Sequence, residues 1–243
     1  MTEEIKSGLG SAVGEIVKAV AVPPAKIIGS WLGEILSINY SQWRVKQAAK
    51  VVEGAGEILA ELGLEPTVCK PKVLLPLIEQ ASLEDDEDLT RKWMGLLASS
   101  VTGDSIHPSY PKILSELVQS EAKVIDYLYS LEVAFEALKG DKTTDGREKR
   151  QQALKQFRLK QLKESVALND EVFSQSIDNL LRLRLCNHPE EYEDYEVVVD
   201  TSLDSDELDV RTESITNNFT DTGAIRLTNL GKSFVKACRG PQS

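Results

Sequence analysis

The chain contains few of the residues that metal and redox sites need. It has three cysteines among 243 residues. Cys69, Cys186 and Cys238 lie far apart and lack the paired spacing that zinc and dithiol sites require. We therefore expect reduced thiols, as in a cytosol, and no bound metal or cofactor.

Histidine is scarcer still, with two in the whole chain. His107 and His188 are each followed by proline. A catalytic histidine needs a positioned carboxylate or nucleophile, and no motif near either residue marks one. We expect His107 to lie in a turn that enters a helix, with its ring hydrogen-bonded to the backbone.

The familiar enzyme motifs are also missing from the sequence, including glycine-rich phosphate loops, G-x-S-x-G elbows and H-E-x-x-H helices. The acidic run Glu84 to Asp88 lacks the D-x-D-x-D-G order that wraps calcium. We expect a protein without enzymatic activity or a small-molecule substrate, with a spatially assembled active site as the alternative.

No long apolar run is present either. Glu15, Lys18, Lys26 and Glu34 interrupt the apolar N-terminal region, so no window reaches the roughly 18 uncharged residues that a spanning helix needs. The N-terminus also lacks a basic leader before an apolar core. We expect a cytoplasmic protein, with peripheral contact at the inner membrane as the alternative.

Acidic residues are concentrated in one segment of the chain and basic residues in another. Twelve acids and one base lie between Asn187 and Gly223, which accounts for the net charge of −11 of the whole chain. Lys139 to Glu164 is basic, with nine Lys or Arg against four acids. Charged runs are most often solvated faces, so the sign alone does not identify a partner.

The first sixty residues contain an internal repeat. GSAVGEIV at Gly10–Val17 returns as GSWLGEIL at Gly29–Leu36, and Pro23-Pro24 lies between the copies. Because proline ends one helix and can start the next, we predict a helical hairpin, followed by a helix from Ser41 to Leu62.

Four glycines of this repeat are candidates for an interaction surface, because glycines four apart share a helix face and allow close helix approach. The candidates are Gly10, Gly14, Gly29 and Gly33, together with Trp31. A tightly packed helical pair in a core is the simpler interpretation, and core packing is also the expectation for Trp31 and Trp43. Self-association and contact with a membrane surface remain alternatives.

The segment from Lys70 to Leu128 carries helical signatures. Pro71 marks a helix start, and the acidic run Glu84 to Asp88 suits the N-terminus of a second helix, where unpaired N–H groups favour negative charge. Leu89, Trp93, Leu96 and Leu97 then repeat at helical spacing, which predicts one buried stripe.

The chain carries, in order, proline-flanked LLPLIE, the acidic step, W-x-x-LL, His107-Pro108, IL-x-x-L and E-A-x-x-x-x-YL, and LTNLG follows near the C-terminus. This order of motifs resembles the abortive-infection alpha (Abi-alpha) family of bacterial defence proteins. The resemblance implies a role in resistance to bacteriophage. It supplies no catalytic residue.

The C-terminal half has the layout of a winged helix. We predict helices over Glu121 to Leu138, Glu148 to Lys163 and Asn169 to Leu185, strands at Tyr195 to Asp200 and Ala224 to Leu227, and a final helix that starts at Thr228-Asn229. IRLTNLGKSFVKA resembles the junction between a wing and its final helix.

Nucleic-acid binding through this module is disfavoured. The helix that would read DNA has no basic stripe, and an acidic wing is repelled by phosphates. The basic segment still offers interaction candidates, which are Lys149, Arg150, Lys155, Arg158 and Lys160. A nucleic-acid-binding regulator therefore remains an alternative.

The sequence thus predicts a mainly α protein with an N-terminal helical bundle (1–105) and a winged-helix-like α+β module with a small β-hairpin (106–243). We expect defence against bacteriophage through a protein partner or self-association, without catalysis. The alternatives are a nucleic-acid-binding regulator and a membrane-perturbing effector.

Overall fold

The computed structural model describes residues 42–67, 69–102, 106–140, 143–189 and 223–241. Within these ranges the protein is mainly helical, with nine helices and one two-stranded sheet. The elements are α3 (Gln42–Leu62), α4 (Pro71–Ala81), α5 (Glu87–Ser100), α6 (Tyr110–Ser115), α7 (Gln119–Leu138), α8 (Thr144–Lys155), α9 (Leu159–Val166), α10 (Asp170–Arg182), β1 (Cys186–Asn187), β2 (Arg226–Leu227) and α11 (Asn229–Cys238). The glycine repeat with Trp31 and the predicted strand Tyr195 to Asp200 lie outside the described residues.

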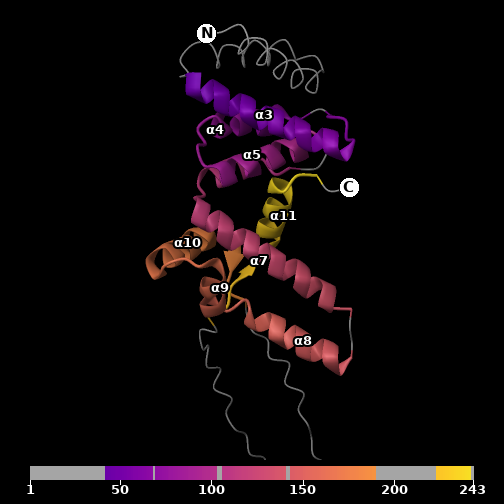
Figure 1. The fold of residues 1–243 in the computed structure, drawn as a ribbon, viewed down its shortest axis with the longest axis vertical. Helices are drawn as coiled ribbons and strands as arrows, with labels where there is room; N and C mark the ends of the chain where they lie inside the picture. The colour runs from indigo at the N-terminus through magenta and orange to yellow at the C-terminus, as the bar shows by residue number, and fades with distance from the viewer. Residues whose placement is uncertain (1–41, 68, 103–105, 141–142, 190–222, 242–243) are drawn as a thin grey trace, which may run out of the picture.

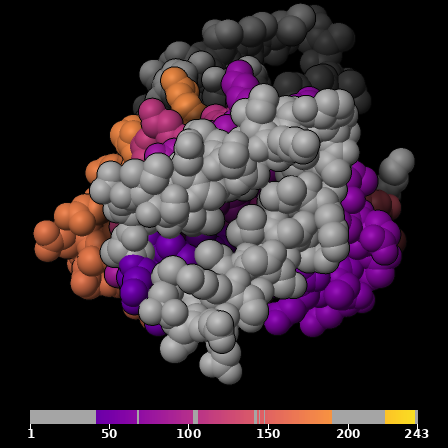
Figure 2. All heavy atoms as spheres, turned by 90° about the horizontal axis from the view of Figure 1, so that it is seen from above, coloured from indigo at the N-terminus to yellow at the C-terminus, as the bar shows by residue number. Residues whose placement is uncertain are grey.

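The helices stack across the long axis of the molecule (Figure 1). α3 lies over α5, α11 lies between α5 and α7, and α8, α9 and α10 lie beyond α7. Viewed from above, orange atoms of the α10 region project on one side and purple atoms from the end of α3 on the other (Figure 2).

Several helix starts lie where the sequence predicts them. Pro71 occupies the first turn of α4. Asp86 precedes α5, and its Oδ1 accepts hydrogen bonds from the backbone N–H groups of Asp88 at 2.8 Å and Leu89 at 3.0 Å. The acidic run is therefore a helix cap, as expected from the unpaired donors at a helix N-terminus.

The prediction for His107 is also confirmed. The backbone N–H of Ser109 donates to His107 Nδ1 at 3.2 Å, just before α6 begins at Tyr110. The ring thus holds the turn that enters the helix.

The single basic helix predicted over Glu148 to Lys163 is wrong. α8 ends at Lys155 and α9 begins at Leu159. Between them Phe157 is buried, and its carbonyl accepts from the N–H of Ile225 at 2.9 Å. Because the backbone of Phe157 is hydrogen-bonded to the segment after Gly223, it does not continue the hydrogen-bond pattern of α8, and the helix ends.

The sheet is small. β1 pairs antiparallel with β2 in the register Cys186 to Leu227 and Asn187 to Arg226. One further antiparallel bridge joins Arg158 to Ala224. The predicted strand at Ala224 to Leu227 is thus present, in shortened form.

α11 packs closely on α5, although the two helices are far apart in the sequence. A Cβ placed on Gly95 would lie 2.2 Å from the carbonyl oxygen of Cys238, so only glycine fits. Ser99 Oγ donates to the carbonyl of Ala237 at 2.9 Å. This contact joins helices from both sides of the predicted domain boundary at residue 105, and that boundary remains a prediction.

The core runs through all the layers, with Trp93 fully buried on α5. Trp43 is 42% exposed at the start of α3, so the prediction of core packing is wrong for this residue. Among the helices in the described ranges, none has both the length and the apolar character to cross a membrane.

Candidate functional site

The basic interaction candidates all lie on α8, α9 and the turn between them. Lys149 Nζ pairs with Asp145 Oδ2 at 2.6 Å, and Arg150 donates to the carbonyl of Leu138 at 3.0 Å. Lys155, Arg158 and Lys160 are exposed. Lys149 and Arg150 thus have part of their charge used within α8 and at its junction with α7.

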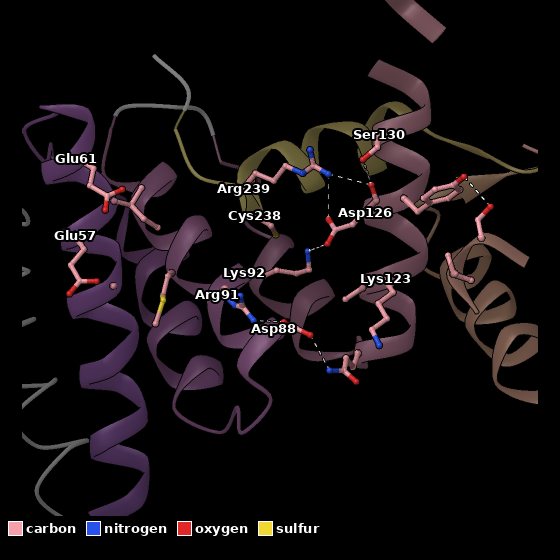
Figure 3. A pocket seen from close by; sticks show the side chains of 18 residues that line it. Glu57, Glu61, Asp88, Arg91, Lys92, Lys123, Asp126, Ser130, Cys238 and Arg239 are labelled. Carbon is pink, nitrogen blue, oxygen red and sulfur yellow. Dashed lines mark hydrogen bonds and ion pairs between the residues drawn. The ribbon is translucent and has the colours of Figure 1, made fainter. Parts of the chain in front are cut away.

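A groove of about 890 Å³ lies between α3, α5, α7, α9 and α11. Its walls come from five helices that are distant in the sequence, so only the fold brings them together. Figure 3 shows Glu57 and Glu61 on α3 at one side and Lys123 on α7 at the other, with Lys92, Asp126 and Arg239 between them.

An ion-pair network forms the floor of the groove. Lys92 Nζ lies 2.5 Å from Asp126 Oδ2, and the Lys92 side chain is 11% exposed. Arg239 Nη2 donates to the Asp126 carbonyl at 3.3 Å and lies 3.9 Å from Asp126 Oδ1. The Arg239 guanidinium also lies 4.5 Å from the centre of the Tyr129 ring. α5, α7 and α11 are therefore joined by charge as well as by packing.

One carboxylate oxygen of Asp126 accepts no hydrogen bond in this network. Its Oδ1 atom is buried and has no hydrogen-bond partner among the described residues. Buried polar atoms are normally hydrogen-bonded. The floor is thus polar but incompletely satisfied.

Cys238 borders the groove as a buried thiol. Burial raises the pKa of its thiol to about 12, with the ammonium of Lys92 opposing the shift. A thiol with this pKa stays protonated at neutral pH, and the thiolate is the reactive form. The cysteine therefore acts as an apolar side chain.

The walls carry charges that the floor does not neutralise. Asp88 is paired, with Arg91 at 2.5 Å and with Gln119 Nε2 at 3.0 Å. Glu57 and Glu61 are exposed one turn apart on α3. Neither makes an ion pair or hydrogen bond with any described residue, and the same holds for Lys123 on α7.

Sequence reasoning did not find this groove. One local signal was present, because Glu57 and Glu61 carry like charge at i and i+4 of the predicted helix from Ser41 to Leu62. The other walls could not be assigned, since nothing local relates α3 to α7 or α11.

A second charged cluster lies apart from the groove. Glu132 is buried on α7, and both its oxygens accept from Arg226 on β2, at 2.9 and 2.6 Å. Lys232 Nζ of α11 lies 2.8 Å from the same carboxylate. Burial alone would raise the pKa of Glu132, but the hydrogen bonds and charges of Arg226 and Lys232 hold it below its ordinary value.

The Arg226 guanidinium is itself enclosed by two rings. It lies 4.8 Å from the centre of Phe135 and 4.7 Å from that of Phe157. Phe157 is the buried residue between α8 and α9, so this cluster fixes the turn that divides them. Its partners are all satisfied, which indicates a structural cross-link between α7, β2 and α11.

Within the described ranges, no group of three or more His, Cys, Asp or Glu could hold a metal ion. Comparison with curated proteins and with solved structures gives no match. The family model described as abortive infection alpha matches residues 45–238. That match spans α3 to α11, and the protein therefore belongs to the abortive infection alpha family.

Proposed function

We propose that the protein acts in bacterial defence against bacteriophage, by abortive infection, through contact with a partner protein and without catalysis. Membership of the abortive infection alpha family carries this proposal, since the family suggests phage defence. The action through a partner is supported by Glu57, Glu61 and Lys123, which line the groove and have no partner among the described residues.

We propose in addition that the C-terminal part is a winged-helix-like module used for protein docking. The order α8, bridge at Arg158, α9, α10, β1, β2 and α11 supports this assignment. The exposed side chains of α10 include Asp170, Glu171 and Asp178. Acidic side chains at this position disfavour a phosphate backbone, which binds through clustered Lys and Arg.

A phage challenge tests the defence function. Two isogenic strains, one with the gene and one with an early frameshift in it, are infected with a broad phage panel. We expect fewer plaques on the strain with the intact gene for at least one phage. Equal plaque counts across the panel would contradict the proposal.

The multiplicity of infection separates abortive infection from a block to entry. At low multiplicity the culture with the intact gene should survive. At high multiplicity the same culture should collapse and release few phage. Survival at both multiplicities would show defence without loss of the infected cell and would overturn the abortive part of the proposal.

A further inference from the structure

The groove between α3 and α7 carries charge of opposite sign at its two sides, and these charges have no partner among the described residues. Glu57 and Glu61 stand on the α3 side, and Lys123 stands on the α7 side (Figure 3). By contrast, the charges between them are paired, as Lys92 with Asp126 and Arg91 with Asp88. Among the described residues, the free charge of the groove is therefore negative on the α3 side and positive on the α7 side.

This charge arrangement opposes the stability of α3. Like charges at i and i+4 repel along a helix surface. Neither Glu57 nor Glu61 has a partner in the described part of the chain. A bound cation at this wall would relieve the repulsion, and no described residue supplies one.

The groove also offers apolar contact surface between the charged walls. Ile58 of α3, Met94 of α5 and Val166 of α9 are partly buried there. Methionine is unbranched and adapts its shape to different partners. Met94 lies directly over Gly54, whose missing side chain leaves the space for it.

We infer that this groove is the docking site for an amphipathic helix of a partner protein. The apolar face of that helix rests on Ile58, Met94 and Val166. Lys or Arg along one edge pairs with Glu57 and Glu61, and an acidic residue on the other edge pairs with Lys123. This inference rests on the proposed action through a partner protein and specifies where and by what chemistry the partner binds.

A helical protein segment fits the groove better than other polymers. Its walls are helices, and laying an amphipathic helix in such a groove is an established mode of recognition. An extended strand would need an open sheet edge, whereas the described sheet has two residues in each strand. Nucleic acid is disfavoured because two unpaired carboxylates repel phosphates.

Three synthetic helical peptides test the charge rule directly. All share one leucine stripe, and they carry lysine along one edge with glutamate along the other, lysine along both edges, or glutamate along both. Binding to the full chain is measured by fluorescence anisotropy. We expect the mixed peptide to bind best and the glutamate peptide worst, and equal binding of all three would overturn the inference.

Charge reversal on α3 provides a readout that misfolding cannot mimic. The Glu57→Lys, Glu61→Lys double variant should lose about tenfold in affinity for the mixed peptide, equivalent to about 1.4 kcal/mol. It should gain affinity for the glutamate peptide. The Glu53→Lys, Glu65→Lys variant makes the same charge change outside the groove and should bind as the wild type does. Unchanged binding by the groove variant, or equal loss by the control, would overturn the site.

The phage assay with the same variants separates this inference from the proposed function. If the wild type protects and the folded groove variant protects equally, the groove is not the docking site and the defence function stands. If the wild type does not protect, the defence function fails, and the peptide data alone decide the groove.

Discussion

Arg226 donates two hydrogen bonds to the buried carboxylate of Glu132, at 2.9 and 2.6 Å. The glutamate side chain is 3% exposed, and Lys232 supplies a second cation to it. A bidentate pair fixes orientation as well as distance. This contact therefore sets where β2 and α11 lie on α7.

Replacing Glu132 by glutamine should destabilise the protein strongly. The amide keeps the shape but leaves Arg226 and Lys232 without their counter-charge, and breaking a buried pair costs about 3 kcal/mol or more. Urea unfolding followed by circular dichroism measures the change. Glu136→Gln, which removes only an exposed pair with Lys139, should change stability little, and a similar loss in both variants would contradict the argument.

The same carboxylate should make stability dependent on acid pH. The pKa of Glu132 in the folded protein lies below its ordinary value of 4.5. A lowered folded pKa means that its contribution is complete above pH 4.5 and is lost as the pH falls through the folded value. Unfolding free energies measured between pH 6 and pH 3 should fall less steeply for Glu132→Gln than for the wild type, and parallel curves would exclude this role.

Two glycines in helices should respond to alanine in opposite ways. Gly95 meets the backbone of α11, so Gly95→Ala forces α5 and α11 apart at a cost of about 1–3 kcal/mol. Gly56 on α3 has nothing within 4 Å of an added Cβ. Gly56→Ala should therefore stabilise by about 0.5–1 kcal/mol, because alanine is the better helix former. Thermal melts of both variants test the contrast, which fails if they shift in the same direction.

Within the acidic run, one residue should account for most of the effect on stability. Asp86→Ala removes the cap of α5 and should cost about 1 kcal/mol. Asp85 is exposed and its side chain makes no hydrogen bond or ion pair with the described residues. Asp85→Ala should leave the unfolding midpoint almost unchanged in the same denaturant titration. Equal losses would mean that total charge, and not the cap, stabilises the helix.

The thiols should be unreactive in the native protein. Cys69, Cys186 and Cys238 are all free and buried. Burial raises the pKa of Cys186 and of Cys238 to about 12, which leaves almost no thiolate at neutral pH. A maleimide should label all three rapidly in guanidinium chloride and slowly without it. Fast labelling of the folded chain would show that the core opens easily.

Local features of the sequence predicted the local features of the fold. The starts at Asp86 and Asn169 follow from capping chemistry, and the start at Pro71 follows from the fixed backbone of proline, so each involves only neighbouring residues. The turn at Phe157 was missed because its cause, the pairing with Ile225, is distant in the sequence. The basic residues around Phe157 favour a helix, and nothing local in the sequence indicates that pairing with Ile225 interrupts it.

The candidate site was harder to predict for the same reason. The spacing of Glu57 and Glu61 on α3 is readable in the sequence, whereas the position of Lys123 at the opposite side of the groove is not. The basic charge of their segment predicts Lys149 and Arg150 as interaction candidates, but Lys149 pairs with Asp145 and Arg150 donates to the carbonyl of Leu138. Position in the fold, more than local charge, decides which side chains remain available.

The close packing of α11 on α5 has a consequence for synthesis of the protein. The hydrogen bond from Ser99 to Ala237 joins residues 138 positions apart. The ribosome must therefore release almost the entire chain before α5 meets the helix that covers it, and such distant contacts form late. A premature stop shortly before Asn229 would remove one wall of the groove and expose the part of α5 that α11 covers, so nascent and truncated chains are the forms most exposed to aggregation and proteolysis.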